Sequence, residues 1–287
     1  MCCIFKGLTA GKANEYGLVL DSSGIPYHVR KGENGWDMYV HDSVCDKALN
    51  AIEEYVKENQ APHPEQEACS SQYEKTFSGI WVSFILLAFH AVIAIHHDNQ
   101  AVIRTYGSAA QQILHGELYR TVTSLMIHAN VLHLLGNMFC IALFGTAVCR
   151  IMGPGVGWLI ILLSGICGNL MNALLYQRNH LSVGSSTAIF GAIGVLAGYR
   201  FLREYRHPGG RARAWLPLGG GLALLAFLGG AKHSDLTAHA FGFLSGIIIG
   251  VIYCFFVNRP AGRQYQICFL LFTLSIIVTS WFRGFGA

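Results

Sequence analysis

The sequence is short of charge. Only 13% of its 287 residues are Asp, Glu, Lys or Arg, whereas about a quarter is usual in soluble proteins. The deficit lies in residues 76–287, which contain four acidic residues against 13 basic ones, a net charge of +9. Residues 1–75 contain 12 acidic and 7 basic residues, a net charge of −5. This composition excludes a chain that is soluble throughout. It favours a small soluble domain followed by a polytopic membrane domain.

Two further absences concern the cellular compartment. The start, MCCIFKGLTAGK, lacks the basic and the long apolar regions of a secretory signal peptide. The nine cysteines are scattered, and no spacing among them indicates a disulfide framework, which suits a reducing cytosol. Two adjacent cysteines, Cys2 and Cys3, are weak evidence for acylation or metal binding.

Residues 1–60 are expected to form a soluble α+β domain. The runs EYGLVLDS, IPYHVRK and GWDMYV are rich in strand-forming residues and are separated by turn-like segments. The following DKALNAIEEYVKEN has apolar residues at helical spacing. Residues 61–76 contain two prolines and many polar residues, so they are expected to be a linker.

Seven hydrophobic segments approach the roughly 20 residues that cross a bilayer as a helix. Between the first two lies 98–127, which is too polar to span and too apolar for an ordinary loop. We therefore expect it to lie along the membrane interface. The seven segments are 77–97, 133–149, 154–176, 186–202, 214–231, 236–257 and 265–282.

Arginine in the short connections indicates the orientation. The connection 199–213 contains five arginines and 258–264 contains two. Both lie on the cytosolic side if the N-terminus is cytosolic, and a bacterial cytoplasmic membrane is the expected location. Ser186 and His239 then both begin spans at the opposite end, so two residues far apart in the sequence lie at the same depth.

Ser186 and His239 are the expected catalytic residues. Polar side chains are costly inside a membrane and are therefore functional candidates, and serine with histidine is the minimum set for nucleophilic acyl transfer. Each helix also has a pair of glycines four residues apart, and on the histidine helix this pair stays within about 20° of His239. Such glycines let two helices approach closely. They are Gly194 and Gly198 on the serine helix and Gly246 and Gly250 on the histidine helix.

A third, acidic member is not obvious. No Asp or Glu lies in the core of an expected span, and Asp235, four residues before His239, could reach the imidazole or cap the helix. We therefore expect a Ser–His dyad rather than a triad. Ser185 leaves an ambiguity of register, in which helical phase favours Ser186. Phe190 lies one turn after Ser186, where its ring could pack on the imidazole.

A second polar cluster is HANVLHLLGN, at 128–137. His133 and Asn137 share a helix face, whereas His128 lies in the segment that enters the helix and can fold back. A tetrahedral intermediate needs preorganised donors for its oxyanion, and Asn137, His128 and the backbone N–H of Ser186 are the candidates. His133 is expected to be structural, with a buried hydrogen bond. His180 and His233 are expected to be loop residues.

These motifs together resemble the rhomboid family of intramembrane serine proteases. The resemblance covers roughly residues 77–257, in the order and spacing of that family. The residues that carry it are Glu117 and Arg120 in ELYR, His128, His133 and Asn137 in HANVLHLLGN, Gly184 and Ser186 in GSST, and His239, Gly242 and Gly246 in AHAFGFLSG.

The resemblance implies an all-α, six-helix proteolytic core at 77–257, with a seventh helix and tail at 258–287. It implies Ser186 as nucleophile, His239 as general base, and His128 and Asn137 in the oxyanion hole. It further implies that Glu117 and Arg120 hold the first interfacial loop. One departure is Thr187, where the family usually has glycine; a β-branched residue narrows the space beside the nucleophile and puts substrate range and rate in doubt.

The expected function is a serine endopeptidase that cleaves single-span membrane proteins near the outer membrane surface through an acyl-enzyme. Family members use no metal and no organic cofactor, and the expected partners are membrane substrates and the lipid bilayer, without nucleic acid. Water must reach Ser186, so we expect a polar cavity capped by loops near 229–237. The alternative is an inactive adaptor of the same fold. A transporter should show internal repeats, and the sequence shows none. Whether the N-terminal domain binds a partner in the cytosol is a question that the sequence leaves open.

Overall fold

The computed structural model describes residues 1–32, 34–60, 75–96, 98–178, 180–229, 235–257 and 259–285. It divides into two compact units, Met1–Ala68 and Cys69–Ala287. Most of the expected linker, His97, His233 and the central part of the expected cavity cap lie outside the described residues.

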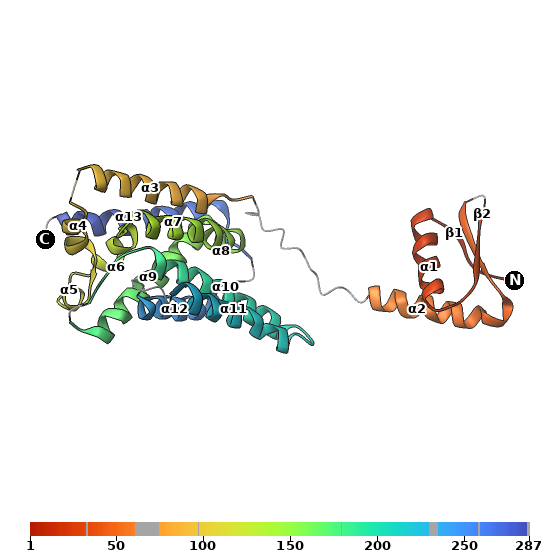
Figure 1. Ribbon diagram of the computed structural model, residues 1–287. Helices are drawn as coiled ribbons and strands as arrows, with labels where there is room; N and C mark the ends of the chain where they lie inside the picture. The colour runs from red at the N-terminus through yellow and green to blue at the C-terminus, as the bar shows by residue number, and fades with distance from the viewer. Residues whose placement is uncertain are drawn as a thin grey trace. The chain divides into compact units, whose positions relative to one another are not determined.

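The N-terminal unit is a three-stranded antiparallel sheet with two helices (Figure 1). The strand order is β1-β3-β2, and one hydrophobic core joins the sheet to both helices. The elements are β1 (Cys2–Leu8), α1 (Ala10–Ser22), β2 (Tyr27–Gly32), β3 (Gly35–Val40), the short η1 (Asp42–Val44) and α2 (Cys45–Gln60). The buried core residues are Leu20, Ile25, Met38, Val40, Ala48 and Ile52.

The prediction of a strand at EYGLVLDS is wrong, because this segment is the second half of α1. Thr9 caps the helix by accepting a hydrogen bond from the Lys12 N–H at 3.3 Å. The buried residues of α1 are Ala13, Gly17 and Leu20, whose spacing of four and three is that of one helix face. The first strand is instead Cys2–Leu8, before the helix.

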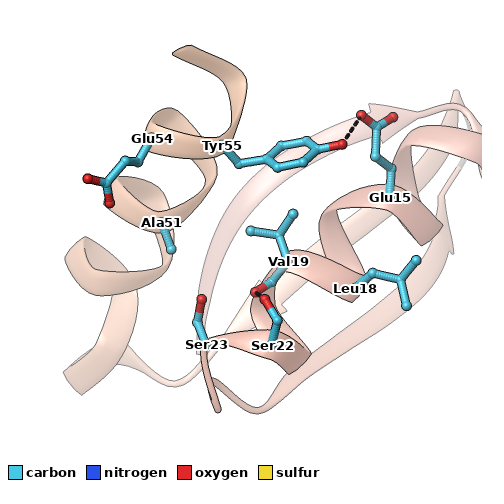
Figure 2. A pocket seen from close by; sticks show the side chains of 8 residues that line it. All are labelled: Glu15, Leu18, Val19, Ser22, Ser23, Ala51, Glu54 and Tyr55. Carbon is cyan, nitrogen blue, oxygen red and sulfur yellow. Dashed lines mark hydrogen bonds between the residues drawn. The ribbon is translucent and has the colours of Figure 1, made fainter. Parts of the chain in front are cut away.

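The N-terminal unit also contains a disulfide, between Cys2 and Cys45. The expectation of no disulfide is therefore wrong for this pair. The two cysteines are 43 positions apart, and only folding brings the start of β1 beside the start of α2. Between α1 and α2 lies a pocket of about 520 Å³, and at its edge the Tyr55 hydroxyl donates to Glu15 Oε1 at 2.9 Å (Figure 2).

The second unit is a helical bundle of polytopic membrane type. Within the described ranges, five helices are long and apolar enough to cross a bilayer, and they coincide with five of the seven expected spans. The five are α3 (Ser78–His96), the continuous helix of α7 (Val131–Cys140), the π-helical turn η3 (Ile141–Gly145) and α8 (Thr146–Met152), α9 (Pro154–Tyr176), α12 (Leu236–Phe256) and α13 (Arg263–Phe285).

The other two expected spans are the helices α10 (Ser186–Arg206) and α11 (Arg211–Gly229). They do not reach the apolarity of the other five, because α10 ends in the charged RFLREYR and α11 begins with RARA. Helix α10 packs against α9, α11 and α12 (Figure 1), and most of its first 13 residues are buried. A helix enclosed by protein faces little lipid and does not need a uniformly apolar surface.

The predicted glycine seam between α10 and α12 is confirmed. A Cβ atom at Gly246 would collide with the carbonyl oxygen of Gly191 on the facing helix. The backbones of the two helices are therefore in contact, with no side chains between them, which is the packing that small residues permit in membranes. The same approach is made by Gly194, Gly198 and Gly250.

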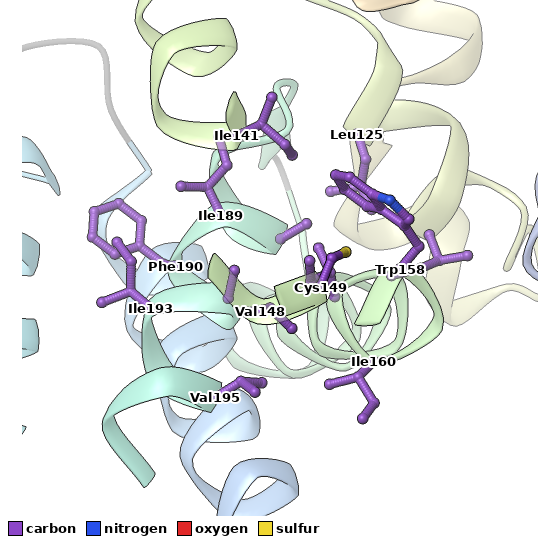
Figure 3. Packing of buried hydrophobic residues seen from close by; sticks show 14 of the residues in the cluster. Leu125, Ile141, Val148, Cys149, Trp158, Ile160, Ile189, Phe190, Ile193 and Val195 are labelled. Carbon is purple, nitrogen blue, oxygen red and sulfur yellow. The ribbon is translucent and has the colours of Figure 1, made fainter. Parts of the chain in front are cut away.

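The hydrophobic core of the bundle lies between α8, α9 and α10 (Figure 3). Trp158 of α9, Val148 of α8 and Ile189 of α10 all belong to it, and each is at most 9% exposed. Beside it Gly153, with φ of +86°, ends α8, and Pro154 begins α9. Glycine adopts that backbone conformation without strain, and proline suits the first turn of a helix.

The segment 98–127 has no helix long enough to span. It consists of short pieces, and β4 pairs antiparallel with β5 (Leu181–Ser182), which lies shortly before α10. This pairing joins the interfacial segment to the chain that leads to Ser186. The pieces are α4 (Asn99–Tyr106), β4 (Ser108–Ala109), α5 (Ala110–Leu114), α6 (Arg120–Thr123) and η2 (Ser124–Met126).

Helix α13 packs against α9 and α6. Near its start, the Gln266 Nε2 donates to the Met152 carbonyl at 2.9 Å, and its Oε1 accepts from the Val156 N–H at 3.0 Å. Near its end, the Trp281 ring lies 4.7 Å from the ring of Tyr106 in the interfacial segment. The seventh helix is thus tied at both ends to the other helices of the bundle.

Candidate active site

Ser186 and His239 meet at the starts of two adjacent helices. Ser186 is the first residue of α10, and His239 lies in the first turn of α12. The Ser186 Oγ is 2.7 Å from the His239 Nε2, within hydrogen-bond distance. The Phe190 ring stacks on the imidazole, with centroids 4.6 Å apart. The contact between Ser186 Oγ and His239 Nε2 is the one that a general base needs with an alcohol nucleophile.

Both residues line a cavity of about 720 Å³. Its wall contains segments from α7, α9, α10, the β5 loop and the start of α12. Apolar side chains such as Leu132, Ile189 and Ile193 form other parts of the wall. A cavity of this volume lies within the range that is typical of ligand-binding clefts. Its polar lining includes Ser124, Asn130, His133, Asn137, Asn169, His180, Ser186, Thr187, Asp235 and His239.

The two neighbouring serines contact different histidines. Ser185 Oγ lies 3.3 Å from the His128 Nε2, whereas Ser186 Oγ contacts His239. His128 is fully buried and is not part of the cavity wall. Burial lowers its pKa to about 3, so the ring is neutral. The structure thus places His128 beside the neighbour of the expected nucleophile, and its oxyanion role stays a prediction.

Asn137 and His133 lie close to Gly184. The Asn137 Nδ2 donates to the His133 carbonyl at 3.1 Å, one turn earlier in α7. A Cβ atom at Gly184 would lie 2.7 Å from the His133 ring and 3.5 Å from the Asn137 Nδ2, and φ at Gly184 is +125°. Only glycine tolerates both this conformation and this approach. The His133 ring meets that of His128 edge to face, with centroids 5.4 Å apart.

Thr187 is accommodated by glycines on the neighbouring helices. It is buried, and a Cβ atom at Gly168 of α9 would lie 2.6 Å from its methyl group. Its carbonyl oxygen occupies the place that a side chain at Gly242 would need. The methyl group of Thr187 therefore fills space that Gly168 leaves empty, while the residue also lines the cavity beside Ser186.

Glu117 and Arg120 hold together the interfacial segment. Arg120 Nε donates to Glu117 Oε2 at 2.6 Å, and its Nη1 donates to the carbonyls of Arg104 and Gly107 at 2.9 and 3.3 Å. The hydrogen bond from Arg120, with a further one from Tyr119, lowers the pKa of Glu117 below its ordinary value. The guanidinium thereby links the end of α4 to the start of α6.

Asp235 caps α12, which is one of the two roles open to it from the sequence. Its Oδ1 accepts from the Ala238 N–H at 3.1 Å. Its Oδ2 accepts from the His180 Nε2 at 2.6 Å and from the Asn172 Nδ2 at 2.7 Å. The sequence contains no signal for the His180 contact, because the two residues are 55 positions apart in segments without a shared motif.

Comparisons with known proteins agree with this architecture. A model of the Rhomboid domain family matches residues 115–256. RHOMBOID-like protein 1 of Arabidopsis thaliana is 31% identical over 144 residues, 50% of this chain and 36% of that protein. Rhomboid-like protease 3 of Toxoplasma gondii is 27% identical over 185 residues, 61% of this chain and 68% of that protein. Rhomboid protease GluP of Bacillus subtilis is 31% identical over 123 residues, 42% of this chain and 24% of that protein.

The fold, the apolar helices and these matches define a multi-pass, helical integral membrane protein. The chain belongs to the rhomboid family. It spans only 36% of the length of RHOMBOID-like protein 1 and 24% of that of GluP. The N-terminal unit, Met1–Ala68, lies outside the matched residues 115–256.

Proposed function

We propose that this chain is an intramembrane serine endopeptidase that cleaves single-span membrane proteins near the outer membrane surface. The observation that carries the proposal is the 2.7 Å contact between Ser186 Oγ and His239 Nε2. The contact lies in the wall of a cavity that is lined by polar side chains from several elements. Membership of the rhomboid family supports protease-like chemistry at this site.

In the proposed reaction, His239 takes the proton of Ser186 while Oγ attacks the peptide carbonyl. The tetrahedral oxyanion is stabilised by the Ser186 N–H, with Asn137 and His128 as further predicted donors. His239 then protonates the leaving amine, and the acyl-enzyme remains. Water attacks the acyl-enzyme with His239 again as base, which releases the acid and restores the serine. A substrate helix must first unwind, because its own hydrogen bonds shield the peptide bond.

The distribution of arginine supports an N-terminus in the cytosol, and we propose a bacterial cytoplasmic membrane as the location. The domain limits remain a prediction, with a soluble domain at 1–60, a proteolytic core at 77–257 and a further helix at 258–287. A disulfide between Cys2 and Cys45 is unusual for a protein domain in a reducing cytosol.

The test is reaction of the full-length protein, reconstituted in liposomes, with a fluorophosphonate probe and with single-span reporter substrates. A serine activated by His239 displaces fluoride from the probe and forms a stable Ser186–phosphonate ester, which mass spectrometry locates. We expect labelling at Ser186 and cleavage of at least one reporter whose helix contains small, helix-destabilising residues. Binding of reporters without labelling or cleavage would contradict the proposal and favour the adaptor.

A second prediction concerns Arg120, whose replacement by alanine should loosen the interfacial segment. The change removes this donor from the Arg104 carbonyl, whereas the Gly107 carbonyl keeps the Ala109 N–H. An unsatisfied buried group costs about 1–3 kcal/mol. We expect the thermal midpoint to fall by roughly 2–10 °C, as measured in detergent by intrinsic fluorescence. The cleavage rate should fall as well.

Arg104→Ala is the matched control, because it removes an exposed guanidinium and keeps the backbone carbonyl. It should leave the midpoint within about 1 °C of the wild type. The lowered pKa of Glu117 adds a pH dependence. The stabilisation that the Glu117 carboxylate gives the folded state is complete above pH 4.5, the ordinary pKa of the group. It is lost as the pH falls through the lower pKa that Glu117 has in the folded protein. Equal midpoints for Arg120→Ala and Arg104→Ala would contradict the assigned role.

A further inference from the structure

A polar cluster at the edge of the cavity joins three separate elements. Asp235 Oδ2, at the start of α12, accepts from the Nε2 of His180 at 2.6 Å and from the Nδ2 of Asn172 at 2.7 Å. Thr237 Oγ1 lies 2.7 Å from Asn172 Oδ1 and 2.9 Å from Asp235 Oδ1, so its one proton goes to either oxygen. The cluster therefore links the end of α9, the loop before β5 and the start of α12.

The charge state of Asp235 fixes the direction of these hydrogen bonds. Burial raises the pKa of Asp235, but hydrogen bonds from His180, the Ala238 N–H and Thr237 outweigh burial and lower it. Asp235 is therefore a carboxylate, which only accepts hydrogen bonds. It follows that the His180 Nε2 carries a proton. The Tyr176 ring stacks on His180 with centroids 4.0 Å apart and planes within 5°, which holds the imidazole in this orientation.

From His180 the chain leads directly to Ser186. The His180 carbonyl accepts from the Ala110 N–H at 2.9 Å, and the next two residues form β5 on the edge of β4. The Gly184 N–H then donates to the Ser124 carbonyl at 2.9 Å. These bonds all join the segment to the interfacial residues 98–127. The His180 side chain joins the same segment to the start of α12.

Asp235 also contacts the helix turn that contains His239. Its carboxylate caps α12, and its carbonyl oxygen accepts from the His239 N–H at 3.0 Å in the first turn. The glycine contacts between α10 and α12 begin at Gly242, which lies against Thr187, and continue along both helices. The Asp235 cap acts on the preceding turn of α12, which carries the imidazole.

We propose that His180 and Asp235 are positioning residues that hold Ser186 and His239 in hydrogen-bonding register. The inference rests on the proposed function. His180 fixes the segment that ends at the serine, Asp235 fixes the turn that carries the histidine, and their mutual bond joins the two. Neither residue exchanges protons with the substrate, and their effect is exerted through the distance between Ser186 Oγ and His239 Nε2.

The experiment compares Asp235→Asn, His180→Ala, His180→Gln and the double variant Asp235→Asn/His180→Ala in the full-length protein in liposomes. Asparagine caps a helix as well as aspartate does, so Asp235→Asn removes the charge and keeps the cap. Misplacement of a reacting group by about 1 Å can cost about 100-fold in rate. We expect kcat to fall about 10- to 100-fold in Asp235→Asn and His180→Ala, with KM changed less than about threefold.

Two further comparisons separate positioning from general stability. His180→Gln keeps an N–H donor and should recover part of kcat. The double variant should lose no more than the worse single variant, because both changes break one bond. Asp98→Asn is the matched control, since Asp98 caps α4 by accepting from the Gln100 N–H and is exposed. It should leave kcat within about twofold of the wild type.

Unchanged kcat in His180→Ala, a rise in KM alone, or losses that multiply in the double variant would each overturn the inference. Histidine-selective ¹⁵N NMR of the reconstituted protein provides a readout that does not require turnover. His180→Ala should shift the His239 signals, whereas His115→Ala, at an exposed histidine, should not. A wild-type chain that is inactive would refute the proposed function, and the NMR comparison would still decide whether His180 positions His239.

Discussion

Replacement of Ser186 by alanine is expected to abolish cleavage of every membrane substrate that the wild-type chain cuts. The same holds for His239→Ala, because the two residues act as one unit and removal of either leaves the other without its partner. In soluble serine proteases, loss of one such residue lowers kcat by at least about 10⁴-fold. We expect a loss of that order here, measured as initial cleavage rates in liposomes at saturating substrate. Substrate binding should persist, since neither change alters the shape of the cavity greatly.

Ser185→Ala is the matched control for this prediction. It deletes the same hydroxyl one position earlier, and that hydroxyl contacts His128 rather than His239. The variant should keep cleavage within about tenfold of the wild type, the loss reflecting a weakened contact with a neutral, buried ring. Full activity of Ser186→Ala, together with loss of activity in Ser185→Ala, would show that the nucleophile had been assigned one residue too late.

Much of the bundle could be predicted from local patterns. The five apolar helices follow from runs of about 20 apolar residues, which a bilayer requires. The close packing of α10 and α12 follows from glycines spaced four apart, since that spacing places them on one helix face. That Ser186 and His239 lie at the same depth follows from the arginines in the connections. These are properties of single segments or of simple alternation across a membrane.

Other features depend on contacts between distant segments, and no local pattern indicates them. The sequence predicts a strand for the second half of α1, because Val and Leu in EYGLVLDS suit either structure until the Thr9 cap and the core are known. The Cys2–Cys45 disulfide requires the path of the whole N-terminal unit. His180 meets Asp235 across 55 positions, from the loop before β5 to the start of α12. Thr187 departed from the family pattern, and its accommodation by Gly168 on another helix became visible only in three dimensions.

Replacement of Gly246 by valine is expected to produce the largest effect of any change outside the Ser186–His239 pair. A Cβ atom at Gly246 would overlap the Gly191 carbonyl oxygen on α10, and a rigid backbone atom of a packed helix has no room to move aside. The two helices must therefore separate or rotate. Overpacking of this kind costs about 1–3 kcal/mol, occasionally more. Displacement of the helix starts by about 1 Å would lower the cleavage rate by about 100-fold.

Gly220→Val is the matched control for the seam. Gly220 lies in the helix α11, and a Cβ atom there would meet no other group within 4 Å. Both variants exchange the same residue type inside a helix, so they share the intrinsic cost of valine and differ only in what the new side chain meets. We expect a fall in thermal midpoint and in fluorophosphonate labelling for Gly246→Val, and little change for Gly220→Val. If both variants label Ser186 at the wild-type rate, the contact between Ser186 and His239 does not depend on the close approach of α10 and α12, and the positions of the two helix starts must be set by the loops alone.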